Sequence, residues 1–348
     1  MNENKTTASL NIYQVLPKVE LHRHLEGSLR LATMLEIANQ HSVTVPPRIV
    51  DLSSLVQVQD EEPFTFTNFL EKFKTLRLFY RSPEVIDRIT REAIEDAARD
   101  NVRYMELRFT PVALSRAEGF PLHDVMAWVC DSTRKAADEF GITVRLIASV
   151  NRHESVELAE QVAWLAASHL EDGILGLDLA GNEAEFPAGP FEGIFKEARQ
   201  SGLKTTVHAG EWGGAQNVGE AIQRFDADRI GHGVRVLEDP SVTALARERG
   251  TVFEVCITSN YQSGVVPALS AHPLTRMLQS GLDATLNTDD PSVSRITLTH
   301  EFKLAAEDLG LPFEVLKQRV LAAASAAFLP DDERRALVAD LESKLTLL

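Results

Sequence analysis

Eight short apolar runs alternate with amphipathic segments along this chain, and their order limits the possible folds more than any other feature. The segment Pro83 to Asp100, for example, carries the apolar stripe of a helix directly after a Ser-Pro start. Alternating strands and helices favour a parallel sheet. The eight runs are Val19 to His24, Tyr104 to Phe109, Val144 to Val150, Ile174 to Ala180, Thr205 to His208, Arg229 to Gly231, Val252 to Ile257 and Ala284 to Asn287.

Polar residues follow every run except the third, so they are spread along most of the chain. An open, doubly wound sheet would gather its ligands at one switch point. In a (β/α)8 barrel, by contrast, the carboxyl ends of all strands converge on one face, where the active site lies. The pattern therefore predicts an α/β fold of the (β/α)8 TIM-barrel type.

Two stretches contain more residues than a simple (β/α)8 barrel needs. Residues from about Gln40 to Pro63 are longer than an ordinary βα connection and contain Pro46 and Pro47, so we interpret them as part of an inserted lid region. The stretch from about Leu311 to Leu348 predicts extra C-terminal helices. No linker, low-complexity segment or repeat divides the sequence, which predicts a single domain over residues 1–348.

Composition excludes several classes of partner. A formal charge of −16 disfavours nucleic acid and anionic membranes, which attract Lys and Arg. The first residues lack the apolar core of a secretory signal, and no run approaches the ~18 apolar residues of a membrane span, so we expect a cytoplasmic protein. Cys130 and Cys256 lie far apart, which indicates neither a disulfide framework nor a cysteine zinc site. The oligomeric state is not indicated.

Histidines and a carboxylate at the ends of three runs predict one metal site. His22 and His24 are two residues apart on a strand, so both project from the same face about 6.6 Å apart. His208 ends the fifth run, and Asp289 follows the eighth. Each residue alone has an ordinary explanation, such as a core histidine or a turn aspartate. Together they form a ligand set that suits zinc with one open position for water.

Three further polar residues follow the fifth, sixth and eighth runs and are candidates for acid and base chemistry. Glu211 lies three residues after His208, and His232 lies between two glycines after the sixth run. Asp290 follows the candidate ligand Asp289. Because a metal lowers the pKa of bound water to about 7, these groups would act beside an activated water.

Five motifs in order give the chain a specific resemblance to the adenosine deaminase family of metal-dependent hydrolases. They are Val-Glu-Leu-His-Arg-His-Leu-Glu-Gly-Ser (19–28), Leu-Asp-Leu-Ala-Gly-Asn-Glu (177–183), His-Ala-Gly-Glu (208–211), Arg-Ile-Gly-His-Gly (229–233) and Asn-Thr-Asp-Asp-Pro (287–291). The resemblance implies a TIM barrel with one Zn²⁺ per chain, which removes the 6-amino group of a small-molecule purine nucleoside.

The resemblance also implies a role for each residue at a matching position. His22, His24, His208 and Asp289 correspond to the zinc ligands. Glu211 corresponds to the residue that protonates purine N1, while His232 and Asp290 orient and deprotonate the attacking water. The implied substrate-binding residues are His24, Glu26, Phe69, Phe73, Gly181 and Asp290, with the Gly181 N–H directed at purine N3.

The implied reaction converts adenosine and 2′-deoxyadenosine to inosine-type products and ammonia. In better-known adenosine-specific members, an aspartate that binds the ribose 5′-hydroxyl stands at the position of Glu26. The longer Glu26 leaves adenine and 5′-substituted adenosines, such as aminodeoxyfutalosine, as alternatives. AMP is disfavoured because no Arg/Lys cluster lies near the motifs.

Other classes fit less well. A dinuclear amidohydrolase would carry a lysine at the end of the fourth strand, where this chain has Ala180, Gly181 and Asn182. Cytidine-type deaminases pair His-x-Glu with Pro-Cys-x-x-Cys, and a Schiff-base aldolase needs a lysine at a strand end. Neither pattern occurs here. A non-catalytic barrel that binds nucleosides or zinc would not need Glu211, His232 and Asp290.

Overall fold

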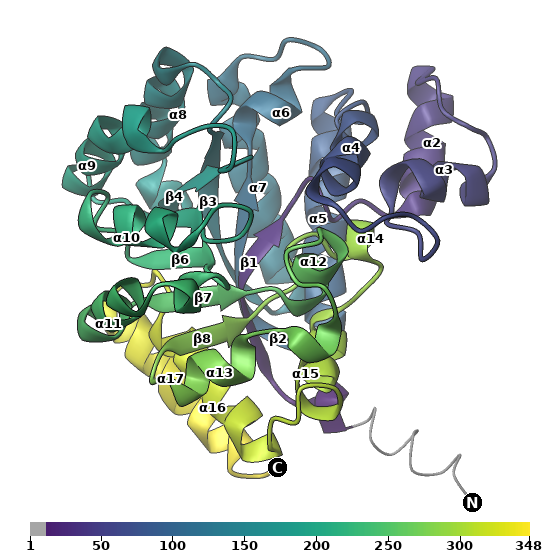
Figure 1. Ribbon diagram of the computed structural model, residues 1–348. Helices are drawn as coiled ribbons and strands as arrows, with labels where there is room; N and C mark the ends of the chain where they lie inside the picture. The colour runs from purple at the N-terminus through teal and green to yellow at the C-terminus, as the bar shows by residue number, and fades with distance from the viewer. Residues whose placement is uncertain (1–11) are drawn as a thin grey trace, which may run out of the picture.

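Short, apolar and β-branched runs form the strands of one parallel sheet. The computed structural model describes residues 12–348, and its sheet contains eight strands in the order β1 to β8 (Figure 1). Each strand pairs in parallel with the next, as the alternation of patterns predicted. The strands are β1 Lys18–His24, β2 Val102–Phe109, β3 Thr143–Asn151, β4 Ile174–Ala180, β5 Lys204–Ala209, β6 Arg229–His232, β7 Val252–Val255 and β8 Asp283–Leu286.

Helices surround this sheet, and several begin at side-chain caps. In α5, Ser82 accepts a hydrogen bond from the Val85 N–H and Pro83 occupies the first turn, as its sequence predicted. The helices are α2 Leu31–His41, α3 Ile49–Val56, α4 Phe66–Leu76, α5 Pro83–Arg99, α6 Pro111–Ser115, α7 Leu122–Phe140, α8 Val156–Ser168, α9 Glu192–Gln200, α10 Ala215–Gln223, α11 Pro240–Arg249, α12 Ile257–Gln262, α13 Leu274–Gln279, α14 Pro291–Ser294, α15 Leu298–Glu307, α16 Phe313–Ser325 and α17 Asp331–Leu345. The (β/α)8 barrel predicted from the sequence is confirmed.

The insertion after β1 contains three helices before the ring helix α5. The predicted lid segment, about Gln40 to Pro63, contains α3, which packs on α4. Its end is fastened to α14, because the Val58 N–H donates to the Val293 carbonyl at 2.9 Å. The insertion continues through α4, and α4 is the part of it that lines the central cavity.

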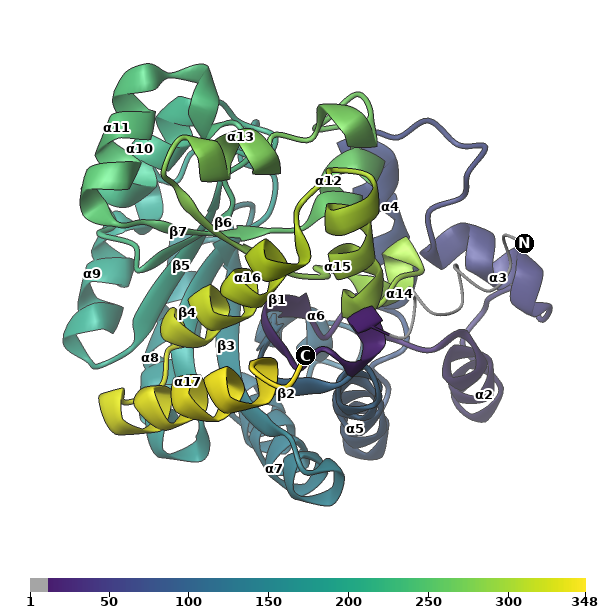
Figure 2. The same ribbon diagram turned by 90° about the horizontal axis from the view of Figure 1, so that it is seen from below.

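Two C-terminal helices follow β8 and α15, as predicted. The first, α16, packs against both β8 and β1 and thereby fills the last place in the helical ring, while α17 packs on α16 (Figure 2). The turn between them covers the amino-terminal end of the barrel. There the Phe328 N–H donates to Glu106, and Arg229 donates to the Ala326 carbonyl.

The barrel closes between β1 and the residues just after β8. No regular ladder joins these two strands within residues 12–348, and a single bridge pairs Arg23 with Asp289. The His24 N–H donates to the Asp289 carbonyl and the Asp289 N–H donates to the His22 carbonyl, both at 2.8 Å. The seam of the barrel therefore passes through residues that the sequence assigns to the metal site.

Candidate metal centre and active site

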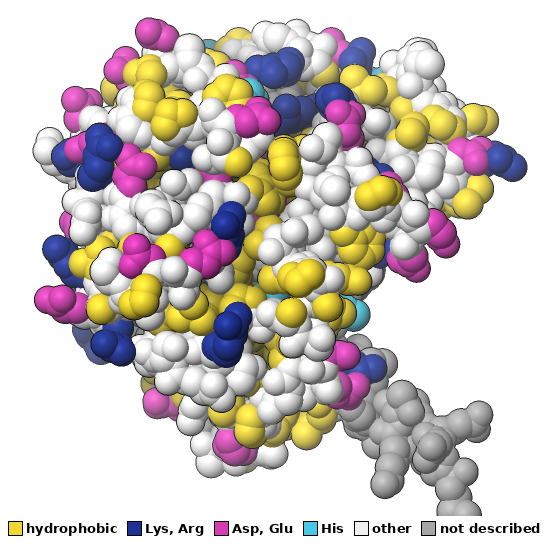
Figure 3. All heavy atoms as spheres, in the orientation of Figure 1, with side chains coloured by type: hydrophobic (Ala, Val, Ile, Leu, Met, Phe, Trp, Pro, Cys, Tyr) yellow, Lys and Arg dark blue, Asp and Glu magenta, His cyan; other side chains and the backbone are white. Residues whose placement is uncertain are grey.

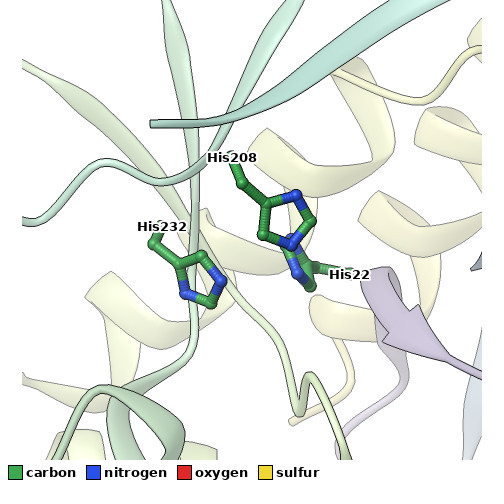
Figure 4. A group of neighbouring side chains, drawn as sticks. All are labelled: His22, His208 and His232. Atoms are coloured by element: carbon green, nitrogen blue, oxygen red, sulfur yellow. The ribbon is translucent and has the colours of Figure 1, made fainter. Parts of the chain in front are cut away.

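Three imidazoles meet inside the carboxyl end of the barrel. His22, His208 and His232 end β1, β5 and β6 or lie near those ends, and their rings point toward one another (Figure 4). The His22 ring centroid lies 4.6 Å from that of His208 and 4.7 Å from that of His232. Strand ends far apart in the sequence thus deliver these side chains to one point.

His24 and Asp289 complete this cluster. Asp289 Oδ1 lies 3.4 Å from Nε2 of both His22 and His24. The buried Nε2 of His22 has no hydrogen-bond partner. Ligand atoms of His22, His24 and Asp289 lie within 4.8 Å of one another, as do those of His22, His208 and His232. A third such group joins His24 to His208, so the four predicted ligands belong to one connected cluster whose imidazoles and carboxylate suit a divalent metal ion.

Carboxylates behind two of the histidines fix which nitrogen faces the centre. His22 Nδ1 lies 2.7 Å from Glu254 Oε2, and His208 Nδ1 lies 2.9 Å from Asp178 Oδ1. A carboxylate on Nδ1 holds the proton there and leaves Nε2 as a neutral ligand. This arrangement supports the fit of the site to a metal ion.

The buried Arg108 joins these two carboxylates. Its Nη2 donates to Glu254 at 2.8 Å, and its Nη1 lies 3.5 Å from Asp178. Burial alone would raise the pKa of both carboxyls, but Arg108 and the histidines hold each pKa below its ordinary value. Both partners therefore remain ionised and able to orient His22 and His208.

Replacing Arg108 with Met should lower metal affinity by about 10- to 100-fold, the usual effect of removing an outer partner of a ligand. Asp178 would lose its arginine partner, and Glu254 would keep only Arg229. Chelator competition at a temperature where the variant stays folded measures the change. Arg229→Met serves as the comparison: Arg229 is equally buried and also keeps Glu254 ionised, but it does not contact Asp178, so its loss should lower metal affinity less. Equal affinities for wild type and Arg108→Met would refute the role.

His232 is held in a strained backbone conformation beside the cluster. Its φ is 59°, and that of Asp289 is 63°, a region that side chains other than glycine seldom adopt. Asn260 Nδ2 lies 3.1 Å from His232 Nδ1. Burial lowers the pKa of His232, so its imidazole is neutral. Its Nε2 lies 3.7 Å from Glu211 and 3.8 Å from Asp289.

Glu211 is a buried carboxyl next to this imidazole. Its backbone N–H donates to Glu183 at 2.6 Å, and that of Gly210 donates to the other Glu183 oxygen at 3.0 Å. Burial first, then the negative charges of Asp289 and Glu183, raise the pKa of Glu211 well above 4.5. A carboxyl in such surroundings keeps its proton near neutral pH and can donate it.

Asp290 faces the same space with an unpartnered oxygen. Burial, followed by Asp289 and Glu26, raises its pKa, and its Oδ1 has no hydrogen-bond partner. A Cβ at Gly27 would lie 1.8 Å from that oxygen, so only glycine leaves room for the carboxyl. Glu26 itself accepts a hydrogen bond from the Thr110 N–H at 2.6 Å.

A cavity of about 90 Å³ opens onto the cluster. Figure 3 shows hydrophobic side chains in a hollow beside α4, with basic side chains at its upper rim. Phe69 and Phe73 of α4 line the cavity, and Gly181 lies on its wall with a φ of 93°. Its walls thus contain every predicted substrate-binding residue: His24, Glu26, Phe69, Phe73, Gly181 and Asp290.

A larger depression of about 720 Å³ lies between β1, α5 and α15 and contains none of the predicted site residues. The cavity beside the cluster, although smaller, is therefore the candidate active site.

Several contributors to this site escaped the sequence reasoning. Arg108 and Glu254 are charged residues inside otherwise apolar strands, a signal that could have marked them as partners of buried groups. Thr110 and Asn151 line the cavity from the ends of β2 and β3. Arg77 lies on the cavity wall at the end of α4, and no motif includes it.

Comparisons with known proteins agree with this geometry. A family model described as adenosine deaminase matches residues 17–344. An adenosine deaminase from Shigella flexneri is 38% identical over 323 residues, which cover 92% of this chain and 96% of that protein. None of the described helices is long and apolar enough to cross a membrane.

Solved structures share the whole fold. A Burkholderia ambifaria amidohydrolase with bound zinc superposes with a TM-score of 0.87 at 28% identity, covering 97% of this chain and 94% of that one. An Arabidopsis protein, ADAL, in complex with IMP superposes with a TM-score of 0.85 at 28% identity, covering 96% and 98%. These similarities support a metal cofactor and a purine substrate for the site.

Proposed function

Because the chain belongs to the adenosine deaminase family and is a hydrolytic deaminase of adenosine-like substrates, we propose that it converts adenosine and 2′-deoxyadenosine to inosine-type products and ammonia. We propose one zinc ion per chain and a cytoplasmic location. The observation that carries the proposal is the buried carboxyl of Glu211 beside a cluster of imidazoles and Asp289, on the wall of a cavity with aromatic side chains.

The metal would be held by His22, His24, His208 and Asp289, whose ligand atoms lie close together. When bound, zinc lowers the pKa of water and supplies a nucleophile at neutral pH. The buried thiol of Cys256 lies near His232 and Asp289, but it stands outside the positions that match the family's ligand set. The ligand set is therefore imidazole and carboxylate, which suits zinc.

Glu211 would supply the proton that the reaction needs at purine N1. Addition of water at C6 breaks the aromaticity of the ring and places negative charge on N1. A protonated carboxyl donates there as that charge develops, and the amino group then leaves C6 as ammonia. The raised pKa of Glu211 provides the required protonation state.

His232 and Asp290 would position the attacking water. The neutral imidazole of His232 lies between Glu211 and Asp289, and Asn260 contacts its other nitrogen. Asp290 offers a buried oxygen without a partner, which can accept a proton from the water and, once protonated, can donate a hydrogen bond to N7. Since both groups lie on the cavity wall, they hold the water on the side of the purine that carries the amino group.

The cavity wall would hold the rest of the nucleoside. Phe69 and Phe73 offer apolar surface to the purine, and the N–H of Gly181, also on this wall, would donate to N3. Beyond the purine, the wall becomes polar at Glu26 and Thr110, which suits a ribose. This polar end favours a nucleoside over free adenine, which stays an alternative together with 5′-substituted adenosines.

Ammonia release from purified protein, with metal analysis of the same sample, tests the proposal. Adenosine and 2′-deoxyadenosine should both be deaminated by protein that contains about one zinc ion per chain. Binding of adenosine without release of ammonia would instead favour the non-catalytic barrel. Preference for adenine over both nucleosides would overturn the assigned substrate while leaving the deaminase chemistry in place.

A further inference from the structure

The helix α4 lines the cavity along one stripe of its surface. Phe69, Phe73 and Arg77 are four residues apart in succession, so they lie on the same face, and all three line the cavity. At 1.5 Å per residue, Arg77 lies about 6 Å beyond Phe73 along the helix axis. The cavity wall thus changes from aromatic to cationic along one helix.

The two ends of α4 mark the two ends of the cavity. Near the start of the helix, the ring of Phe66 lies 5.7 Å from that of Trp212, the neighbour of Glu211. At the other end, the charge of Arg77 acts on both Glu26 and His153. Trp212, beside Glu211, therefore lies near the start of α4, whereas Arg77 lies at the end of this helix on the same cavity wall.

Arg77 has no partner for its charge. Its Nε is buried without a hydrogen bond. Among residues 12–348, no carboxylate oxygen lies within 4.0 Å of its guanidinium, so it forms no ion pair with Glu26. A basic residue at the end of a helix is favourable in itself. That benefit needs only an exposed side chain and does not explain a guanidinium on a cavity wall.

Two arginines near Arg77, one four residues later in the sequence and one whose charge also acts on His153, differ from it because carboxylates neutralise them. Arg81 lies 2.8 Å from Glu118, and Arg116 lies 2.8 Å from Glu154. The chain as a whole carries a net charge of −16, so acidic partners are abundant. An arginine left unpaired inside the substrate cavity is therefore available to an anion from the ligand.

The proposed function orients the nucleoside toward this arginine. With N1 at Glu211 and C6 at the metal cluster, N9 lies on the opposite side of the fused ring and carries the ribose away from Glu211. The ribose then lies at the end that contains Glu26 and Arg77. Of the ribose carbons, C5′ extends farthest from the purine and bears the substituent that can reach the guanidinium.

We propose that Arg77 binds an anionic group carried by C5′, so that the preferred substrates are 6-aminopurine nucleosides with a phosphate or a carboxylate at that position. This inference rests on the proposed deamination and specifies its substrate class. A guanidinium makes charge-assisted, two-pronged hydrogen bonds to either anion. The sequence disfavoured AMP because no basic cluster lies beside the motifs, whereas Arg77 comes from α4, outside all of them.

Values of kcat/KM for adenosine, AMP, adenosine-5′-carboxylate and the neutral 5′-methylthioadenosine test the proposal. One anionic substrate should exceed adenosine by roughly 10- to 100-fold, the range expected for a charge-assisted contact. Which of AMP and the carboxylate is faster identifies the anion. Faster turnover of adenosine or 5′-methylthioadenosine than of both anionic substrates would overturn the proposal that Arg77 binds an anion at C5′.

Variants test whether the preference for an anionic substrate depends on Arg77 itself or on nearby arginines in general. Arg77→Met should abolish the preference for the anion over adenosine, whereas Arg77→Lys should retain part of it. The control Arg81→Met removes a neighbouring arginine that is paired with Glu118, and it should keep the preference. An unchanged preference in Arg77→Met refutes the assignment.

Calorimetric binding of IMP and inosine keeps this inference distinct from the proposed function. Wild-type protein should bind IMP more tightly than inosine, and Arg77→Met should bind the two alike. If no purine is deaminated but this difference holds, the proposed reaction fails and the anion site stands. If the wild type deaminates adenosine but binds IMP and inosine equally, the proposed reaction stands and the anion site at Arg77 is refuted.

Discussion

Glu211→Gln should retain its metal and lose turnover of adenosine by roughly 10²- to 10⁴-fold, the usual contribution of a positioned general acid. The amide preserves the shape of the side chain but cannot transfer a proton to N1. Because the Glu211 carboxyl lies on the cavity wall and belongs to no metal-ligand group, metal content should stay at the wild-type level. Steady-state kinetics and metal analysis of the same preparation measure both results.

The matched control is Glu92→Gln, which changes another buried glutamate far from the cavity. Glu92 accepts hydrogen bonds from Thr33 and Arg88 on the outer side of the barrel. Its substitution should alter stability and leave kcat near the wild-type value. Near-normal turnover by Glu211→Gln would remove Glu211 from the proton-donating role.

The pH dependence of the wild type follows from the same carboxyl. A glutamate of ordinary pKa, 4.5, would be ionised at neutral pH, but burial and the nearby Asp289 and Glu183 raise the pKa of Glu211. Since the protonated form is the competent one, kcat/KM should be retained at neutral pH and fall as the pH rises through that raised pKa. An increase of kcat/KM across the alkaline range would contradict this assignment.

Removal of the metal should abolish turnover and also destabilise the fold. Protein dialysed against a chelator should release no ammonia from adenosine, and Zn²⁺ should restore activity, since no other group near the cavity lowers the pKa of water. An ion present at a thousandfold its Kd adds about 4 kcal/mol to the free energy of unfolding. Thermal unfolding with and without Zn²⁺ measures this increase in stability.

Chelator-treated protein that retains turnover would show that no metal is needed. A control for incomplete removal is His208→Ala, which deletes one candidate ligand. It should need more Zn²⁺ for the same activity than the wild type does.

The sequence predicted the barrel and the centre of its site because both depend on local patterns. Eight apolar runs alternate with helices, and parallel pairing follows from that order. His22, His24, His208 and Asp289 each stand at the end of a run, so the convergence of strand ends places them together. The positions of these residues in the sequence are therefore enough to predict that they lie close together.

Other parts of the site depend on contacts across the barrel that no local pattern encodes. Arg108 and Glu254 lie on β2 and β7, and their 2.8 Å contact spans the barrel interior. Arg77 reaches the cavity only because α4 folds back over the strand ends. The sequence placed Phe69 and Phe73 over the purine by resemblance, but the same helical stripe continues to a residue that the resemblance does not assign.

The seam between β1 and β8 links metal binding to the stability of the closed barrel. His22 and His24 exchange backbone hydrogen bonds with Asp289 across the seam, and the same side chains are the candidate ligands. An ion held there would tie the first strand to the last, where the sheet has no regular ladder of its own. Protein without the ion should therefore open first at that joint, and amide hydrogens of β1 should then exchange faster than in the metal-bound form.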